Sequence, residues 1–531
     1  MTRILLVNPK FPDSFWSFRW AFDNVLTGQR AMTAPLGLAT VAALSPSAWD
    51  VAIADEDIEP LPADPDVDIV GICGMGVQFE RQMELVRHYR SRGYYVVVGG
   101  AYASLCPELY EGRVDTVISG EAEYVWPEFC RDFEAGEARA LYKEEGTVDL
   151  ADSPMPRFDL LKLEHYYTMP LQFSRGCPFQ CEFCDIIVMF GRKPRLKSID
   201  QVMRELEELR RLGVNRPFFV DDNFIGNRAA AKGLLRAISN YQRERGSPFR
   251  FGTEASINIA QDPELLDLMR SADFGWLFVG IETSSEAALA EVKKTQNLRV
   301  GLLESVGKIH AAGIDVFGGF IIGFDSDDRA AIERQHRFII DSGMAVAIVN
   351  LLSAIPKTPL HDRVAREGRL LEGFHGHIGS NLGTNIVPKR MSFDEMLAAY
   401  RDLCLEVSSD RQIAERIRNK LRRFGAPPNT HRGSLPFKLL QLARLLVRGI
   451  LPGGWRRVYH FLRTLRSSSP AVLYSICADW TMALAIRDYV RRQFAAGDSK
   501  STRHAKRMPV VSRPPQSAVV EPAVVLQRVA E

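Results

Sequence analysis

Three cysteines stand within eight residues of this sequence, in the string CPFQCEFC that runs from Cys177 through Cys181 to Cys184. A disulfide framework needs an even number of thiols, and a structural zinc site usually needs four ligands, often from two matched pairs. Three thiolates can instead hold three irons of a [4Fe-4S] cluster and leave the fourth iron open to a chemical ligand. The spacing therefore predicts a reactive iron–sulfur site, with a zinc knuckle completed by a distant ligand as the alternative.

The rest of the composition is that of an ordinary globular protein. The chain has 531 residues, of which 46% are hydrophobic and 25% charged, and its net charge is only +2. This balance argues against a chain built mainly to wrap nucleic acid. No signal-like segment and no long uncharged apolar run is present, so we expect a cytoplasmic protein without a spanning helix. The other cysteines are scattered singly and fit reduced thiols: Cys73, Cys106, Cys130, Cys404 and Cys477.

Residues 1–150 alternate short β-branched runs with stretches of helical periodicity. Continuous apolar strands that alternate with helices indicate a parallel sheet covered on both faces. We therefore predict an N-terminal α/β domain, Rossmann-like and doubly wound. Its expected strands are residues 3–9, 49–56, 68–76, 94–102 and 114–121.

A second α/β series occupies residues 151–370, after a break marked by Pro154 and Pro156. Six strand–helix units predict a partial (β/α)6 barrel, with its site at the carboxyl ends of the strands. Ser198 or Asp200 is expected to cap the helix that follows the cysteine string, and Gly213 is expected to end it. The expected strands are residues 169–174, 217–222, 250–256, 276–283, 315–324 and 346–356.

Beyond the barrel we predict a helical region at 371–496 and a disordered tail at 497–531. Between Arg411 and Arg466 the sequence has fourteen Lys or Arg and a single acid, Glu415. Amphipathic basic helices of this kind can lie on an anionic lipid surface. They can equally pack their apolar face on the barrel and leave the basic face solvated. Nucleic-acid binding is a weaker alternative, since no recognised RNA module accompanies the stretch.

The cysteine string resembles the signature of the radical S-adenosylmethionine (radical SAM) superfamily, with Phe183 as the aromatic residue before the third cysteine. The resemblance covers roughly residues 171–360. It implies that the open iron binds the methionine part of S-adenosylmethionine. One electron from the cluster then cleaves a sulfur–carbon bond and releases a 5'-deoxyadenosyl radical, which abstracts hydrogen from the substrate.

The same resemblance implies that S-adenosylmethionine is held at the ends of successive barrel strands. Polar residues there would bind the amine, ribose and carboxylate, and glycines would lie beside the adenine. The residues so implied are Phe183, Asp221, Asp222, Asn223, Glu254, Ser256, Glu282, Gly318, Gly319 and Gly323. The alternatives are Asx turns, salt-bridged rim residues and packing glycines.

A Rossmann-like domain in front of such a barrel, followed by a helical extension, resembles the cobalamin-binding radical SAM group and its hopanoid methylase subgroup. Loops at the carboxyl ends of the strands would hold the corrin. The candidates are Gly74, Met75, Gln78, Gly99, Gly100, Gly120 and Glu121. No Asp-x-His-x-x-Gly motif is present, so a histidine ligand on the lower face is not expected. No G-x-G-x-x-G follows the first strand, which disfavours a dinucleotide.

The resemblance implies a cobalamin-dependent methyltransferase acting on an unactivated carbon of a lipid-like or secondary-metabolite substrate. No catalytic residue is assigned beyond the cluster cysteines. An electron donor such as flavodoxin or ferredoxin is an expected partner, contact with the inner face of a membrane is considered, and no nucleic-acid partner is expected. The alternatives are an oxidoreductase or cyclase that binds cobalamin without methyl transfer, a tRNA methylthiotransferase, and a non-catalytic cluster protein.

Overall fold

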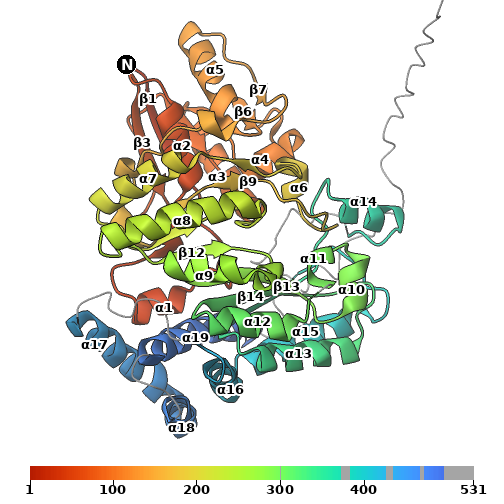
Figure 1. Cartoon of the computed structure of the whole chain (residues 1–531). Coiled ribbons are helices and arrows are strands. Elements are labelled where there is room, and N and C mark those ends of the chain that lie inside the picture. Colours follow the sequence, from red (N-terminus) through yellow and green to blue (C-terminus); the bar gives the residue numbers. More distant parts are fainter. Residues whose placement is uncertain (299, 372–382, 426–434, 467–471, 496–531) are drawn as a thin grey trace, which may run out of the picture.

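A computed structural model describes residues 1–298, 300–371, 383–425, 435–466 and 472–495 of the chain. The predicted disordered tail lies outside these residues. Figure 1 shows a first parallel sheet at the top, a second sheet wrapped by helices in the middle, and a group of C-terminal helices at the lower left. The predicted α/β fold class, with a Rossmann-like domain, a partial barrel and a helical C-terminal region, is confirmed.

The first sheet is parallel throughout and has the order β3-β1-β4-β5-β6-β7. Apolar side chains cover both of its faces, as the continuous apolar strands predict. The five expected strands are all present, and β7 adds an edge strand that was not expected. The strands are β1 (Arg3–Asn8), β3 (Asp50–Asp55), β4 (Ile69–Ile72), β5 (Tyr95–Val98), β6 (Thr116–Ser119) and β7 (Leu141–Lys143). The helices of this part are α2 (Leu36–Leu44), α3 (Phe79–Arg90), α4 (Ala101–Leu105) and α5 (Ala122–Ala135), with the short turns η1 (Gly76–Gln78), η2 (Pro107–Tyr110) and η3 (Leu150–Asp152).

The second sheet is the curled half-barrel, with the order β15-β14-β13-β12-β11-β8-β2 and parallel pairing between neighbours. The six expected strands are confirmed. The seventh, β2, comes from the N-terminal 150 residues and pairs with β8, so the N-terminal part of the chain adds one strand to the second sheet. The predicted domain boundaries stay a prediction. The strands are β2 (Ala31–Thr33), β8 (Tyr166–Leu171), β11 (Pro217–Phe219), β12 (Phe251–Glu254), β13 (Phe274–Glu282), β14 (Asp315–Ile322) and β15 (Val346–Leu351).

Helices cover the outer face of this sheet, and α7 shows how the local sequence sets them. The Ser198 hydroxyl accepts from the Gln201 amide at 3.2 Å, while the Gln201 side chain accepts from the Ser198 amide at 2.9 Å. This capping box makes Ser198, rather than Asp200, the cap. Gly213 follows the helix at φ +78°, a conformation that favours glycine. The helices are α7 (Ile199–Arg211), α8 (Arg228–Glu244), α9 (Pro263–Ser271), α10 (Glu286–Glu291), α11 (Thr295–Leu298), α12 (Leu302–Ala311), α13 (Arg329–Ser342) and α14 (Pro359–Arg366). Short elements complete this part: α6 (Ile186–Met189), β9 (Ser174–Arg175), β10 (Arg195–Leu196), η4 (Phe158–Leu160), η5 (Leu163–His165) and η6 (Ile257–Gln261).

The C-terminal helices pack under the barrel and against α1 (Arg19–Asn24) from the N-terminal segment. Lys420, buried on α16, pairs with Asp315 at the start of β14 at 2.8 Å and with Asp479 on α19 at 2.5 Å. No helix among the described residues is long and apolar enough to cross a membrane. The elements are α15 (Phe393–Val407), α16 (Asp410–Leu421), α17 (Leu435–Arg444), the π-helix η7 (Leu445–Ile450), η8 (Leu451–Gly453), α18 (Gly454–Leu465) and α19 (Leu473–Ala495).

Candidate active site

The loop with the three cysteines leaves the carboxyl end of β8 and is fastened at both ends. The short strand β9 before it pairs antiparallel with β10 after it. Gly176, at φ +95°, begins the loop, and a Cβ there would meet three backbone carbonyl oxygens at 3.1 to 3.2 Å. Only glycine suits that position, because both the dihedral angle and the space exclude a side chain.

The three thiols suit a multi-iron cluster better than a single metal ion. Cys181 is buried, Cys177 and Cys184 are half-buried, and burial raises the pKa of the latter two. Within the described part of the chain, no three His, Cys, Asp or Glu side chains converge as they would around one ion. A cluster needs no such convergence, since each thiolate binds a different iron. The three thiols on one loop therefore fit an iron–sulfur cluster.

Two further side chains reach the cysteine loop from the segment after α10. Gln296 donates from Nε2 to the Cys181 sulfur at 3.5 Å. Lys294 is buried, forms an ion pair with Glu282 and lies 5.8 Å from the centre of the Phe183 ring. The oxygen of the Gln296 amide is buried without a hydrogen-bond partner among the described residues. Sequence reasoning missed both residues, because no local motif marks them and they lie more than a hundred positions from the cysteines.

The predicted polar residues at the ends of β11 and β12 meet beside this loop, in different roles. Asp221 accepts from the Phe173 amide at 2.8 Å and from the Ser174 hydroxyl at 2.6 Å, so both its oxygens are used inside the protein. Asp222 accepts from the Gly176 amide at 2.7 Å, and burial raises the pKa of its carboxyl to about 6.

Glu254 is the carboxylate at this rim without a partner. Its side chain makes no hydrogen bond or ion pair with any residue that the structure describes. Burial raises the pKa of Glu254 to about 7, and repulsion from Asp222 and Asp221 adds to the effect. Beside it, Asn223 and Ser256 bond to each other at 3.2 Å. Glu254 is half-buried. A carboxylate without a partner inside the protein, beside two other acids, favours a cationic ligand, which is the chemistry of a sulfonium with an ammonium group.

The other predicted S-adenosylmethionine residues lie further along the sheet. Glu282 ends β13 at a bulge with φ +63°, a strained conformation for a non-glycine residue. A Cβ on Gly318 would lie 2.3 Å from the Met344 sulfur, and one on Gly319 would lie 2.8 Å from the Phe278 ring. Gly323 has φ +107°. Packing and backbone angle explain these glycines, and their adenine role stays a prediction.

The inner face of the half-barrel is aromatic below the carboxylates. Trp276 stacks on Phe218 at 4.8 Å between ring centres and on Phe317 at 4.7 Å. Trp16, from the N-terminal segment, meets Phe278 edge-on at 4.8 Å. Half-buried and buried residues alternate along β13, so Trp276 and Phe278 share the inner face. The rim is therefore polar and the layer beneath it apolar.

The predicted cobalamin residues gather at the carboxyl edge of the first sheet. A Cβ on Gly100 would lie 2.8 Å from backbone atoms of Gly74, so these loops touch through their backbones. Met75 is 52% exposed. The Tyr102 hydroxyl and one Glu144 oxygen are buried at this edge without a partner among the described residues. Orphaned polar atoms and an exposed apolar side chain at the carboxyl edge of a doubly wound sheet fit a bound corrin.

The remaining cobalamin candidates have partners within the protein. The Gln78 side chain is buried and bonds to Asn8, Pro9 and the Met75 amide. Gly99 has ordinary contacts with Ile118, and Gly120, at φ +101°, lies against Glu144. Their cofactor role stays a prediction.

Glu121 forms a bridge between the two sheets. It pairs with Arg175 at 2.7 Å and with Arg195 at 2.6 Å, and these arginines flank the cysteine loop on β9 and β10. Glu123 also pairs with Arg175 at 2.7 Å. The carboxyl edge of the first sheet is thus tied directly to the loop that carries the three thiols.

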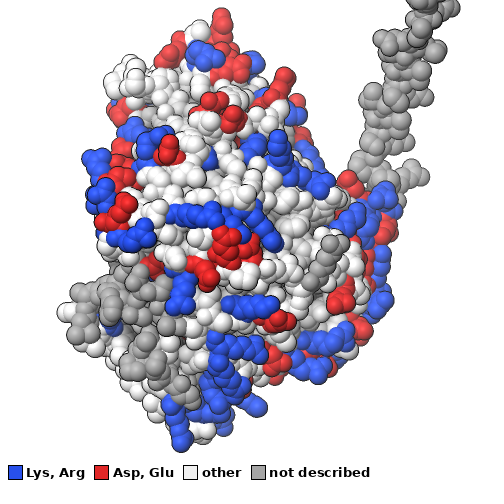
Figure 2. All heavy atoms as spheres, viewed as in Figure 1, with Lys and Arg blue, Asp and Glu red and all other residues white. Residues whose placement is uncertain are grey.

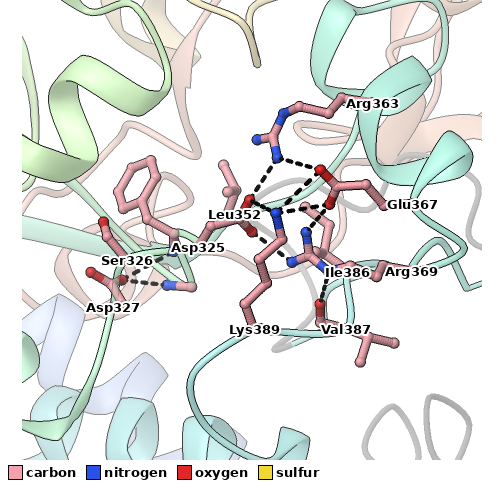
Figure 3. Close-up of polar contacts among 12 residues, drawn as sticks. Asp325, Ser326, Asp327, Leu352, Arg363, Glu367, Arg369, Ile386, Val387 and Lys389 are labelled. Carbon is pink, nitrogen blue, oxygen red and sulfur yellow. Dashed lines mark hydrogen bonds and ion pairs between the residues drawn. The ribbon is translucent and has the colours of Figure 1, made fainter.

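A second ionic cluster fastens the outer side of the cysteine loop, as Figure 3 shows in part. Glu182, between Cys181 and the third cysteine, pairs with Arg363 on α14 at 2.9 Å. Arg363 pairs with Asp325 at 2.6 Å, and Arg369 and Lys389 converge on the same carboxylate. These bases hold the pKa of Asp325 at about 2. An open pocket of about 690 Å³ lies at this cluster.

Comparisons with known proteins agree with this geometry. Residues 171–339 match the model of the radical SAM superfamily, residues 30–129 match a B12 binding domain, and residues 358–486 match a Domain of unknown function (DUF4070). An uncharacterized methyltransferase of Synechocystis sp. is 37% identical over 502 residues, which cover 92% of this chain and 93% of the relative. The chain belongs to the cobalamin-binding radical SAM family.

Further similarities to this radical SAM protein extend over most of the chain. The hopanoid C-2 methylase of Rhodopseudomonas palustris is 37% identical over 407 residues, covering 75% of this chain and 76% of that one. A structure of the methyltransferase TsrM from Kitasatospora setae, with cobalamin and a [4Fe-4S] cluster bound, has a TM-score of 0.55 at 16% identity and covers 94% of this chain and all of that one. The radical enzyme OxsB has a TM-score of 0.58 at 16% identity, covering 96% and 83%. These two structures share the fold.

The family match confirms the prediction of a radical SAM enzyme with a B12-binding domain, and with it the cofactor prediction at the level of the family. It does not assign individual residues. The cysteines of the first sheet region lie apart: Cys106 is buried in the core on one face of the sheet, and Cys130 in the core on the other. The second cluster that a methylthiotransferase would carry has no counterpart in these positions.

Proposed function

We propose that this radical SAM protein is a cobalamin-dependent methyltransferase that methylates an unactivated carbon of a lipid-like or secondary-metabolite substrate. The observation that carries the proposal is the convergence at one rim of the three-cysteine loop and the unpartnered Glu254, tied through Arg175 to the carboxyl edge of the B12-type sheet. Catalysis at an unactivated carbon needs all three groups within reach of one substrate.

When bound, the cofactors supply one-electron reduction and a transferable methyl group. The chain's own residues bind and orient them. Cys177, Cys181 and Cys184 hold the cluster, and the Gln296 amide donates a hydrogen bond to the Cys181 sulfur. Hydrogen bonds to a cluster sulfur tune its potential.

Asp222 and Glu254 bind the cationic methionine part of S-adenosylmethionine. The free oxygen of Asp222 and the unpartnered Glu254 carboxylate supply the negative charge that the ammonium and sulfonium require. The Lys294–Glu282 pair lies on the other side of the loop. The Lys294 ammonium could donate a hydrogen bond to the carboxylate of the ligand in place of Glu282. A buried lysine keeps its charge only beside an anion, so one carboxylate would replace the other.

On the cobalamin side, the backbone-lined loops of Gly74 and Gly100, with the Tyr102 hydroxyl, hold the corrin. The sequence has no histidine in an Asp-x-His-x-x-Gly context, so no histidine is proposed among the residues that would hold the corrin. Through its two arginine partners, the Glu121 carboxylate holds the carboxyl edge of the first sheet, where the corrin would bind, beside the cysteine loop.

The aromatic interior supports an apolar substrate. Phe218, Trp276 and Phe317 form a stacked aromatic surface below the polar rim. Such a surface favours aliphatic carbon over charged groups. The Rhodopseudomonas relative is named a hopanoid C-2 methylase, and this name also supports a lipid-like substrate.

An electron donor such as flavodoxin or ferredoxin is part of the proposal. Three bases without ion-pair partners among the described residues, Lys293, Arg366 and Arg390, line the pocket beside Glu182 on the cysteine loop. Five bases and four acids line this pocket, and the acids already have base partners, so the three remaining bases favour an acidic protein as the donor.

The test is anaerobic purification followed by metal analysis and a methylation assay. We expect about four irons and one cobalt per chain, reductive cleavage of S-adenosylmethionine, and products heavier by one CH2 unit per methylation. Cleavage without any mass gain in cell extracts containing the substrate would favour the oxidoreductase or cyclase alternative. A protein that holds iron but no cobalt would remove the methyl carrier and contradict the proposal.

A further inference from the structure

Helix α18 is turned with one apolar stripe outward. Trp455, Tyr459 and Leu462, spaced i, i+4 and i+7, lie on one side and are 75%, 52% and 55% exposed. Arg457 and Phe461, on the opposite side, are buried. A helix that packs on a globular protein normally buries its apolar stripe and exposes its basic one. Helix α18 packs Val458, Phe461 and Leu465 inward as expected, but it buries Arg457 with them and leaves a second apolar stripe exposed.

The packing of Arg457 sets this orientation. Its guanidinium donates to the Asp410 carboxylate at 2.8 Å and to the Gly449 carbonyl at 2.7 Å. Phe461 packs edge-on against Trp480 of α19. A buried arginine whose hydrogen bonds are made holds its helix face inward, because turning it out would leave the Asp410 charge with fewer partners. The outward stripe is therefore a built feature of the fold.

The preceding helix continues the exposed apolar surface. Leu440 on α17, Val447 on η7 and Leu451 on η8 are 46%, 63% and 59% exposed. The segment η7–η8 packs against α18, so the two stripes adjoin. Contiguous exposed apolar surface of this kind marks an interaction site in a folded protein.

The surroundings of this surface are basic. Residues 435–466 contain seven Lys or Arg and no Asp or Glu. The Arg456 guanidinium lies 5.6 Å from the Trp455 ring centre, and that of Arg463 lies 5.6 Å from Tyr459. Figure 2 shows Lys and Arg gathered at the lower end of the molecule, where α16 and α18 lie.

We propose that this face docks on an anionic lipid surface, with the apolar side chains at the headgroup boundary and the arginines on the phosphates. We call it the apolar–basic face; it consists of Leu440, Val447, Leu451, Trp455, Tyr459 and Leu462 with Arg456 and Arg463. The inference deepens the proposed function and rests on it for one point, that a lipid-like substrate would be reached at that surface. It also assigns a role within the stretch that matches the domain of unknown function.

Charge decides between a lipid surface and the other occupants. In a two-fold dimer the same patch meets itself, which would place the arginines of one copy against those of the other. A polynucleotide would satisfy the arginines but leave aliphatic Leu440, Val447 and Leu451 without a partner. Anionic lipid satisfies both, as in interfacial amphipathic helices with aromatic, aliphatic and basic residues.

The experiment is binding of the full chain to vesicles, followed by sedimentation and by tryptophan fluorescence. Vesicles of phosphatidylcholine with phosphatidylglycerol should bind the protein at low salt, release it as salt rises, and shift Trp455 emission to the blue; phosphatidylcholine alone should bind it weakly. The triple change Trp455→Ser, Tyr459→Ser and Leu462→Ser should weaken binding at least about tenfold, and so should Arg456→Gln with Arg463→Gln. Trp455→Phe should keep binding and lose the blue shift.

Matched controls lie on other surfaces. Leu141→Ser is an exposed apolar change on β7, and Arg211→Gln with Arg236→Gln removes two exposed arginines from α7 and α8. These variants should bind vesicles as the native chain does. All variants should retain iron content and cleavage of S-adenosylmethionine, which separates loss of docking from loss of the proposed chemistry.

Three results would overturn the inference. One is absence of binding to both kinds of vesicle. Another is self-association of the native chain that the triple serine variant abolishes while vesicle binding is unchanged. The third is tighter binding to a polynucleotide that depends on the arginines and not on the apolar residues. Vesicle binding in a protein without methylation activity would uphold the docking face and count against the proposed function alone.

Discussion

Two clusters of charge, a partly buried one at the rim of the half-barrel and a buried one at its foot, differ in how completely their charges are paired. At the foot, Lys420 pairs with Asp315 and Asp479. At the rim, Glu254 has no partner among the described residues. A buried charge is costly unless it is compensated. The paired foot is therefore structural, and the unpaired rim points to a ligand that completes it.

The same contrast separates the two kinds of basic residue in the C-terminal region. Arg416 and Lys420 on α16 and Arg457 on α18 are buried, and Arg416 donates to three backbone carbonyls. Arg456 and Arg463 are surface residues that border exposed aromatic rings. A count of bases between Arg411 and Arg466 treats these as one population. The structure divides them into buried residues that form internal ion pairs and hydrogen bonds, and surface residues that belong to the proposed docking face.

The largest expected effect concerns the cysteines at the rim. Replacing Cys177, Cys181 or Cys184 with Ala should each abolish the cluster absorbance and the cleavage of S-adenosylmethionine, because a cluster held by two thiolates is lost. Cys477→Ala, in the foot region, should leave both unchanged. Visible spectra and iron analysis of anaerobically purified variants measure the result, and cleavage retained by any of the three would contradict the assignment.

The foot should respond in stability rather than in binding. Lys420→Met leaves two carboxylates buried without their base and should lower the free energy of unfolding by about 3–5 kcal/mol. Lys389→Met removes a surface partner of Asp325 and should cost no more than about 1 kcal/mol. Denaturant unfolding measures both, and equal losses would show that burial does not distinguish the two ion pairs.

Asp222, at the rim, should respond in its binding of S-adenosylmethionine. Asp222→Ala would remove the proposed charge-assisted hydrogen bond to the methionine amine. Such a bond is worth about 1.5–3 kcal/mol, so affinity for S-adenosylmethionine should fall about tenfold to a hundredfold. Calorimetry on the reconstituted variant measures this fall. Unchanged affinity would reduce Asp222 to a turn residue that holds the Gly176 amide.

The smallest effect is the pH dependence contributed by Glu254. Burial raises its pKa from 4.5 to about 7, so between these values the folded state binds more protons than the unfolded state. Its stability contribution is therefore complete below pH 4.5 and is lost as the pH rises through about 7. Without added S-adenosylmethionine, the free energy of unfolding of Glu254→Gln should rise relative to that of the native chain by about 1–2 kcal/mol as the pH goes from about 5 to 8. A constant difference across this range would show that the carboxylate is not desolvated.

Local patterns in the sequence were sufficient for much of the architecture. The apolar runs predicted eleven strands that the structure contains, because a strand buried on both faces must be continuously apolar. Ser198 and Gly213 marked the ends of α7 through capping and backbone angle. The short strands β2 and β7 were missed, since three residues carry too little periodicity.

What the sequence determined by itself was the chemistry: three thiolates on one loop after a strand, a phenylalanine beside the third, and carboxylates at the next strand ends, all of them set by nearest neighbours along the chain. Tertiary structure alone decided which of these groups are left unpaired. It gave Asp221 two partners and left Glu254 with none among the residues that the structure describes. It also brought Gln296 and Lys294 to the cysteine loop, placed Glu121 between the two sheets, and turned α18 with Arg457 inward. Pairing and burial depend on residues far apart in the chain, and spacing along one segment carries no record of them.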